Sequence, residues 1–549
     1  MKTKIVLVCL IIISLTSLCF KLYLTDFSIP VNSDNLSYVL NGIAHTDGDF
    51  MQPPHRAIGW SIFLSFFFNF LNSENFLDYS NLAKILSIVV STSTIFLIYS
   101  VARKFFDQRY SITASCLFAF LPHLNHNSTL ALSEPIFILT ILGSFYFLLH
   151  EKSKFIIFSL MLVGFAYWIR QNGVLVLIII SITYLLTFRK SQNFLRNYGI
   201  GIIFFIIIIS PMLIQKNDQY GDPFYSVYQD ILFSKNYEAF ITKAMSDADT
   251  QTETSASEFI KNEGILSFIN NFIFGGIASS LSILFKLSFP YLFILLPFGI
   301  IFSLRAFDQK RKYIKINWIF ILTSFFFMCI VIAVVPEKRF LFFLLPPLIL
   351  FSVIPIQRVI EYGLSTFSFS RKQKDIFLVI VLITVVILSG LSTLRYEKTD
   401  YTLENEQSDF AGFALQNLHG NVLRDFGGST DYVTDVVLLH YNDFKDFKID
   451  YWTDKEERKK FDFREIGVYA ESLEELISNG EALNLKFLIS NEQETFYYPF
   501  VDQIYHNEKK YPYLIKIFDS EDYGYEKLKI KVFEIDYKKF HELDGDENE

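Results

Sequence analysis

The feature that most constrains this chain is a succession of long Ile-, Leu- and Phe-rich runs that ends near residue 394. A helix needs about 20 predominantly apolar residues to cross the hydrocarbon core of a bilayer. The stretch 57–71 is apolar but too short to cross, so it predicts an interfacial or re-entrant helix. We therefore expect a polytopic α-helical protein in the lipid bilayer, with about eleven transmembrane helices near residues 5–24, 81–101, 110–126, 134–150, 155–170, 173–188, 198–215, 276–304, 317–335, 339–357 and 375–394.

The charge of the chain changes abruptly after these runs. Residues 395–549 hold 35 acidic and 19 basic side chains, whereas the preceding part holds 22 acidic and 30 basic ones. All four cysteines lie in the apolar runs, which excludes a disulfide framework for the acidic part. Short apolar runs at 421–424, 486–490 and 527–535 predict strands, and 408–418 and 472–479 predict helices. The chain is therefore divided into a membrane domain, 1–395, and a soluble α/β domain, 396–549.

The distribution of Lys and Arg predicts the orientation in the membrane. No small-residue cleavage site follows the first apolar run, and Lys21 and Tyr23 at its end are typical of an anchor at the membrane surface. With a retained, cytoplasmic N-terminus, every inner loop is rich in Lys and Arg, and the outer loops carry few of them. An odd number of spans in the cell membrane then places the C-terminal domain outside the cytoplasm.

Polar residues gather in the predicted outer loops rather than in the spans. A transporter or channel is expected to carry ionisable residues inside its spans. Here only Lys84 and Lys286 stand out, and both lie close enough to a span end to reach the surface. The longest outer loop, 216–271, is polar, as expected of a lid or a disordered segment. Chemistry at the outer surface is therefore favoured over passage through the membrane.

The first outer loop, 25–57, carries the most informative motifs. Asp34 is followed by Tyr38, by Asp47-Gly48-Asp49 and by the turn Pro53-Pro54-His55-Arg56. Ser133-Glu134 precedes a later span, Trp168–Gly173 separates two spans, and Glu337-Lys338-Arg339-Phe340 precedes Pro346-Pro347. In this order the chain, over about residues 1–360, resembles the GT-C superfamily of membrane glycosyltransferases. The resemblance is strongest to the branch of protein O-mannosyltransferases, the lipid A aminoarabinose transferase and rhizobial lipopolysaccharide sugar transferases, although many relatives have Asp-Glu where this chain has Asp34-Asn35.

The resemblance implies an inverting glycosyltransferase that moves one sugar from a polyprenyl-phosphate donor to an extracytoplasmic protein, lipid or glycan acceptor. A carboxylate at the membrane surface can deprotonate the acceptor hydroxyl, and arginine can grip phosphate oxygens with two donors. Asp34 is the candidate base, with Glu134 as a second catalytic candidate. The candidate substrate-binding residues are Tyr38, His55, Arg56, Arg170 and Arg339. Each has a bland alternative: a solvated loop carboxylate, a helix-start glutamate or a snorkelling arginine.

A divalent metal is a further hypothesis. His123 and His126 are three residues apart near the end of the third predicted span, where His126 could join Asp34 and Glu134 around a cation. Two histidines near an interface are more often merely interfacial. A nucleic-acid partner is not expected.

Two other function classes remain open. The chain could be a non-catalytic scaffold or polysaccharide-assembly protein whose outer domain binds a partner. It could also be a lipid or glycan transporter, which the scarcity of charge inside the spans disfavours. In the outer domain, Tyr451-Trp452-Thr453-Asp454 differs from the Trp-Trp-Asp-Tyr-Gly of oligosaccharyltransferases, which disfavours transfer of a whole glycan to Asn.

Overall fold

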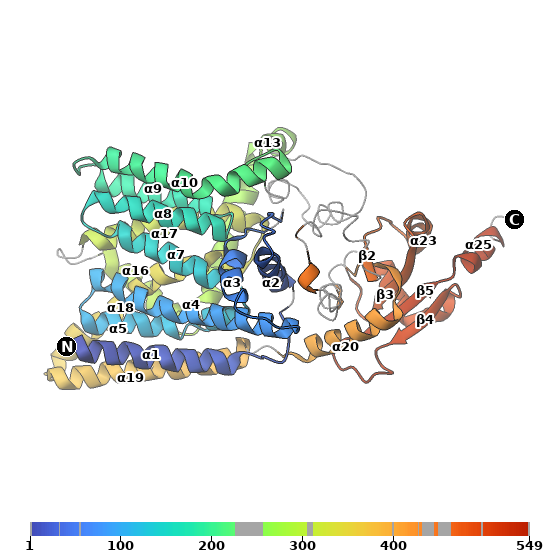
Figure 1. Cartoon of the computed structure of the whole chain (residues 1–549). Coiled ribbons are helices and arrows are strands. Elements are labelled where there is room, and N and C mark those ends of the chain that lie inside the picture. The colour runs from blue at the N-terminus through green and yellow to red at the C-terminus, as the bar shows by residue number, and fades with distance from the viewer. Residues whose placement is uncertain are drawn as a thin grey trace.

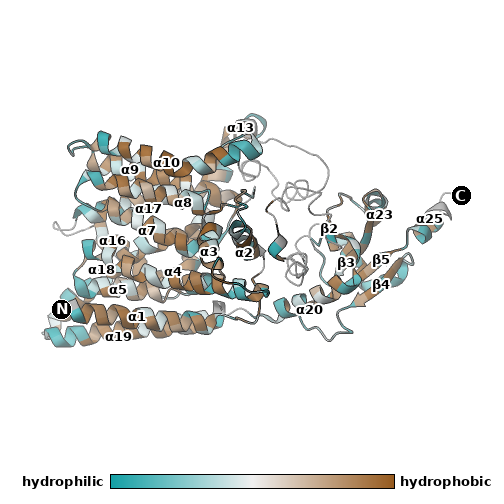
Figure 2. Ribbon diagram, viewed as in Figure 1, coloured by the Kyte–Doolittle hydropathy of each residue, from teal (hydrophilic) through white to brown (hydrophobic). Residues whose placement is uncertain are grey.

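The computed structural model shows a long helical bundle with a smaller α/β domain at one end (Figure 1). The N-terminus lies at the opposite end of the bundle. Apolar residues dominate the bundle, whereas hydrophilic residues are frequent at its two ends and over the α/β domain (Figure 2). The structure describes residues 3–31, 33–53, 56–225, 256–304, 311–397, 400–425, 428–430, 444–447, 449, 463–495 and 498–546.

The bundle has the composition of a multi-pass membrane protein. Within the described ranges, seven helical segments are long and apolar enough to cross a membrane, and five further apolar helices have 10–17 residues. The predicted α-helical membrane fold with a C-terminal α/β domain is confirmed, whereas the total of about eleven spans stays a prediction. The helices that match single predicted spans are α1 (Thr3–Leu24), α4 (Phe76–Phe105), α7 (Glu134–Leu148), α8 (Ile156–Ile169), α9 (Gly173–Phe188), α10 (Phe194–Tyr220), α17 (Arg311–Val334), α18 (Leu345–Arg358, after η4, Lys338–Leu344) and α19 (Arg371–Ser392).

Two predicted spans are wrong as single helices. The span 110–126 is interrupted between α5 (Gln108–Ala119) and α6 (Pro122–Thr129). The span 276–304 consists of α15 (Gly276–Leu287) and α16 (Leu292–Leu304), and α15 continues from α13 (Ala256–Glu263), α14 (Ile265–Phe268) and η2 (Ile269–Gly275). A proline lies at each break, Pro122 and Pro290. Because proline lacks the backbone N–H, it fits the start of a helix but does not continue one.

Two lysines that the sequence assigned to the membrane surface point into the protein instead. Lys21 on α1 is 1% exposed, and its Nζ donates to Ser91 Oγ on α4 at 2.9 Å. Lys84 on α4 donates to the carbonyl oxygens of Asp26, at 2.8 Å, and Ile29. A buried ammonium needs such partners because its desolvation is costly. These bonds fasten the segment after α1 to α4, and that segment leads directly to the site described below.

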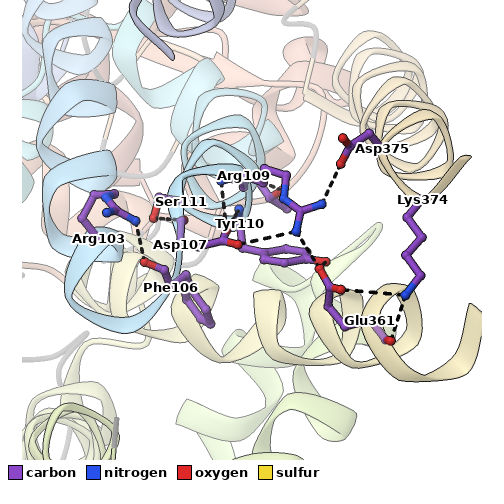
Figure 3. Close-up of polar contacts among 10 residues, drawn as sticks. Arg103, Phe106, Asp107, Arg109, Tyr110, Ser111, Glu361, Lys374 and Asp375 are labelled. Carbon is purple, nitrogen blue, oxygen red and sulfur yellow. Dashed lines mark hydrogen bonds and ion pairs between the residues drawn. The ribbon is translucent and has the colours of Figure 1, made fainter. Parts of the chain in front are cut away.

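An ion cluster fastens the end of the bundle where the N-terminus lies (Figure 3). Arg109 on α5 donates to Asp375 on α19 at 2.6 Å and to Glu361 in η5 (Val359–Gly363) at 2.8 Å. Tyr110, which is fully buried, donates its hydroxyl to the same Glu361 carboxylate at 2.8 Å. Lys374 donates to the backbone carbonyl of Glu361 at 3.1 Å. Three helical segments that are distant in sequence are joined here.

The C-terminal α/β domain, which we call the outer domain after its predicted side of the membrane, contains a five-stranded sheet of order β2-β1-β3-β5-β4. β1 (Gly420–Leu423) pairs in parallel with β2 (Phe463–Ile466) and β3 (Leu485–Asn491), and β5 (Ile530–Ile535) pairs antiparallel with β3 and β4 (Leu514–Asp519). The three predicted strands are β1, β3 and β5, whereas β2 and β4 were missed. The α-helices in the described part of this domain are α20 (Thr402–Asn417), α23 (Leu473–Ala482), α24 (Pro499–Asp502) and α25 (Tyr537–Asp546).

Candidate active site

The site is built on α2 (Ser33–Thr46), a short helix between α1 and α4 at the end of the bundle nearest the outer domain (Figure 1). Its apolar residues Leu36, Val39 and Leu40 are fully buried in one cluster with residues of α3 (Gly59–Phe68) and α4. On α3, Trp60 donates its indole N–H to the carbonyl oxygen of Ala131 at 2.8 Å. The packing fixes the first turn of α2, where a carboxylate is favoured by the helix dipole. Asp34 lies in that turn.

Asp34 is held by two arginines from distant parts of the chain. Arg56 Nη2 donates to Asp34 Oδ1, and Arg339 Nη1 donates to Asp34 Oδ2 at 2.9 Å. Burial on its own would raise the pKa of Asp34, but the positive charges of Arg56 and Arg339 outweigh it and lower the pKa to about 2. Asp34 is therefore ionised, with both carboxylate oxygens engaged.

Arg339 connects Asp34 to two further carboxylates. Its Nε and Nη2 donate to Glu337 Oε2 at 2.8 and 2.5 Å. Its Nη1 also lies 4.0 Å from Glu134 Oε1. Glu337 was quoted in the sequence motif but was not proposed as a site residue. The signal available was its spacing, two residues before Arg339; in the structure Glu337 is extended and immediately precedes η4, which contains Arg339.

Glu134 and Arg170 form the most deeply buried pair of the site. Glu134 begins α7 with a side chain only 2% exposed, and Arg170 Nη1, just after α8, donates to its Oε1. The Arg170 guanidinium also lies 5.9 Å from the ring centre of Phe137 and 5.6 Å from that of Phe340. Burial alone would lower the pKa of Arg170, but the charge of Glu134 raises it above its usual value. Arg170 therefore stays charged although little water reaches it.

Tyr38 joins α2 to this pair. Its hydroxyl lies 3.2 Å from Ser133 Oγ, next to Glu134 in the sequence, and the Arg56 guanidinium lies 5.5 Å from the centre of its ring. Of the candidates named from sequence, the structure thus brings Asp34, Tyr38, Arg56, Glu134, Arg170 and Arg339 into one network. His55 lies outside the described residues.

Among the described residues, the predicted ligands Asp34, His126 and Glu134 are not arranged as a metal-binding group. Throughout the described ranges, no group of three or more His, Cys, Asp and Glu side chains is arranged to hold a metal ion. Asp34 and Glu134 face guanidinium groups, which would compete with a cation for the same oxygens. His126 on α6 does not complete a ligand set with them. The donor set therefore does not fit a divalent ion, and no step below uses one.

The arrangement suits the binding of a phosphate group and the transfer of a proton from a hydroxyl. Three guanidinium groups and three carboxylates alternate in one continuous series of contacts, at the end of the bundle that faces the outer domain. Arginine can exchange a carboxylate partner for a phosphate, because both present paired oxygens to its fork of donors. A carboxylate freed in this way can take a proton from a hydroxyl.

The fold of the chain is similar to that of known proteins. Residues 67–214 match the family model described as dolichyl-phosphate-mannose-protein mannosyltransferase. No curated protein sequence matches the chain. Among solved structures, ArnT from Cupriavidus metallidurans bound to undecaprenyl phosphate is 9% identical, with a TM-score of 0.56 over 95% of this chain and 97% of that one. The chain has the GT-C fold.

Two structures of the oligosaccharyltransferase from Archaeoglobus fulgidus share this GT-C fold. One is a complex with an inhibitory peptide and a dolichol-phosphate, 13% identical, with a TM-score of 0.55 over 89% of this chain and 70% of that one. The other contains Zn and sulfate and is 12% identical, with a TM-score of 0.56 over 92% of this chain and 72% of that one. At such identities the likeness concerns the GT-C fold, and the network around Asp34 is argued from this chain alone.

Proposed function

We propose that this protein is a glycosyltransferase that moves a single sugar from a polyprenyl-phosphate carrier to an acceptor hydroxyl outside the cytoplasm. The observation that carries the proposal is the ion network in which Arg56 and Arg339 both hold Asp34. Support comes from the family match and from GT-C relatives whose structures contain undecaprenyl phosphate or dolichol-phosphate. The N-terminus is then cytoplasmic and the outer domain extracytoplasmic, as the Lys and Arg distribution predicts.

The proposed step is a single displacement at the anomeric carbon. The acceptor oxygen forms a bond to that carbon while the bond from the carbon to the phosphate oxygen breaks. Asp34 takes the hydroxyl proton, and the phosphate leaves with the electron pair and remains on the lipid. One displacement inverts the anomeric centre, and no covalent sugar–enzyme intermediate is required.

Donor binding also changes Asp34 in the direction that the step needs. A carboxylate with a pKa of about 2 is a weak base, whereas an effective general base has a pKa near the working pH. When the donor phosphate engages Arg56 and Arg339, their charge is shared with a second anion. The effect of burial, which raises the pKa of Asp34, is then less opposed. The base is therefore activated only when the donor is in place.

The deciding experiment compares purified wild type with Asp34→Asn in detergent. Sugar release is measured from a panel of radiolabelled undecaprenyl-phosphate sugars, together with binding of the same donors. Asp78→Asn is the matched control, because Asp78 lies in the first turn of α4 and accepts a hydrogen bond from Ser73 Oγ, at 2.5 Å. We expect Asp34→Asn to lose turnover by about 10²- to 10⁴-fold with donor binding retained.

Each outcome of this experiment has a clear meaning. Loss of turnover in Asp34→Asn but not in Asp78→Asn supports the assignment. Equal turnover in wild type and Asp34→Asn rules Asp34 out as the base. Donor binding without turnover in every protein, for all sugars tested, favours the non-catalytic scaffold.

A further inference from the structure

The connection between β1 and β2 of the outer domain is long and returns to the membrane domain. It comprises residues 424–462, whereas connections within α/β units are usually short. It leaves β1 at the carboxyl end of a parallel strand, beside the point where the strand order reverses between β1 and β3. Functional loops of α/β sheets leave from such positions. Its described part includes η8 (Phe444–Asp446), which lies next to α2.

Aromatic packing fastens this connection to α4. The ring of Phe444 meets the rings of Phe76 and Tyr79 edge-on, with centroids 5.6 and 5.7 Å apart. Phe444, Phe447 and Ile449 are buried in the same apolar cluster as the core of α2. Next to them, Lys445 Nζ lies 2.5 Å from the exposed carboxylate of Glu74. The contact is thus an apolar interface with a polar rim.

Asp49 supplies a directed bond between the two domains. Its Oδ2 accepts the backbone N–H of Ile449 at 2.9 Å, and its Oδ1 accepts the backbone N–H of Met51 at 3.1 Å. Its backbone carbonyl oxygen lies 2.6 Å from Nδ1 of His45, in the last turn of α2. The carboxylate therefore links the turn that leads to Arg56 with the outer domain, and the backbone of the same residue is bound to the end of α2. Asp47, two residues earlier, is exposed.

We infer that Asp49 is a positioning residue, which holds residues 444–447 and 449 of the outer domain over α2 so that they form part of the acceptor side of the site. The assignment to the acceptor side rests on the proposed function. The docking of the segment by Asp49 does not depend on it. Asp34 and Asp49 lie at opposite ends of α2, which at 1.5 Å per residue spans about 20 Å. The docked segment is thus placed to contact the acceptor away from the reacting hydroxyl, and it leaves the donor phosphate to the arginines.

The docking is tested first, without any substrate. Hydrogen exchange is followed in the peptide that covers residues 444–449 of the full chain in detergent, for wild type, Asp49→Asn and Asp47→Asn. Because a hydrogen bond to a charged acceptor is lost, we expect exchange in Asp49→Asn to be about tenfold faster. Asp47→Asn, with the same loss of charge in the same turn, is expected to match wild type. Equal exchange in wild type and Asp49→Asn, or equal acceleration in both variants, overturns the positioning role.

The acceptor side is tested by two activities of the same variants. Radiolabelled undecaprenyl-phosphate sugar is supplied to membranes from cells expressing the chain. Release of free sugar to water is compared with incorporation of label into the membrane material that remains after the lipids have been extracted. We expect Asp49→Asn to lose incorporation at least tenfold while release to water stays within twofold of wild type. A parallel loss of both activities overturns the assignment to the acceptor side. Inactivity of wild type in both assays contradicts the proposed function, whereas the exchange experiment still decides the docking.

Discussion

Arg339 Nη1 lies 2.9 Å from Asp34 Oδ2, although 305 positions separate the two residues in the chain. Asp34 precedes nearly all the membrane helices, and Arg339 follows all but the last two of them. The contact therefore exists only once the bundle has assembled. Because the candidate base and the candidate phosphate-binding group are in contact, a substitution at either residue is expected to affect the other.

Arg339→Lys is expected to weaken donor binding although it keeps the positive charge. Arg339 uses Nε, Nη1 and Nη2 to reach Glu337 and Asp34, whereas lysine has one ammonium group and no planar fork. We expect the Kd for undecaprenyl phosphate to rise by about tenfold or more. Arg109→Lys, in the ion cluster at the other end of the bundle, is the control and is expected to leave this Kd unchanged. An unaltered Kd in Arg339→Lys would contradict the role in phosphate binding.

Arg170→Ala is expected to destabilise the protein strongly because it leaves Glu134 buried without its partner. Loss of one member of a buried ion pair costs about 3–5 kcal/mol. The double variant Glu134→Gln/Arg170→Gln removes both charges and is expected to recover a large part of that loss. The apparent Tm in detergent measures both effects. A double variant no more stable than Arg170→Ala would show that the pair is not coupled as the contact indicates.

The low pKa of Asp34 predicts that the folded protein loses stability in acid. Its pKa is about 2 in the folded protein and near 3.8 when unperturbed, so the folded state favours the ionised form. This stabilisation is complete above pH 4 and disappears as the pH falls towards 2. It amounts to at most about 2 kcal/mol, because the side chain is partly exposed. The difference in Tm between wild type and Asp34→Asn should therefore be largest near neutral pH and shrink below pH 4; a difference that is constant with pH would contradict the ion pairs.

The raised pKa of Asp425 in the outer domain predicts the opposite dependence of stability on pH. Burial raises its pKa to about 6, with Asp502 adding to the shift, while hydrogen bonds from Thr430 and Asn491 oppose it. The folded state therefore holds a proton that the unfolded chain releases near pH 4. Stability of this domain should fall by about 2 kcal/mol as the pH rises from 4 to 6. Hydrogen exchange in the peptide covering β3, corrected for the intrinsic effect of pH, should show this fall in wild type and not in Asp425→Asn.

Much of the bundle could be predicted because a membrane helix is encoded locally, by one uninterrupted apolar run. The two spans that were predicted wrongly also have a local cause. Pro122 and Pro290 interrupt apolar runs whose average hydropathy is that of a continuous span. The inward direction of Lys21 could not be predicted, because it depends on Ser91, a partner on another helix. In the outer domain β2, which has only four residues, is too short to show a period.

The residues of the site were chosen from motifs, but their pairing was not predictable. Nothing local in the sequence says that Arg170 takes Glu134 while Arg56 and Arg339 share Asp34, because these contacts arise from the packing of α2, α7 and η4. The role of Asp49 was hidden for the same reason. Its Asp-Gly-Asp context is typical of a turn, and its partner Ile449 lies 400 positions away.

The alternation of three guanidinium groups with three carboxylates makes the resting site electrically neutral. Such a site exerts little attraction at a distance, so we expect the donor to arrive by lateral diffusion in the membrane rather than by long-range steering, with rates that depend weakly on ionic strength. A polyprenyl-phosphate sugar is a phosphodiester with one negative charge, and the phosphate left after transfer gains a second ionisation with a pKa near 6. Because Asp34 has taken the acceptor proton, the total charge of the site and its ligand is unchanged by the transfer. Release of the spent carrier should therefore be favoured once Asp34 loses that proton, since the restored carboxylate again competes for Arg56 and Arg339.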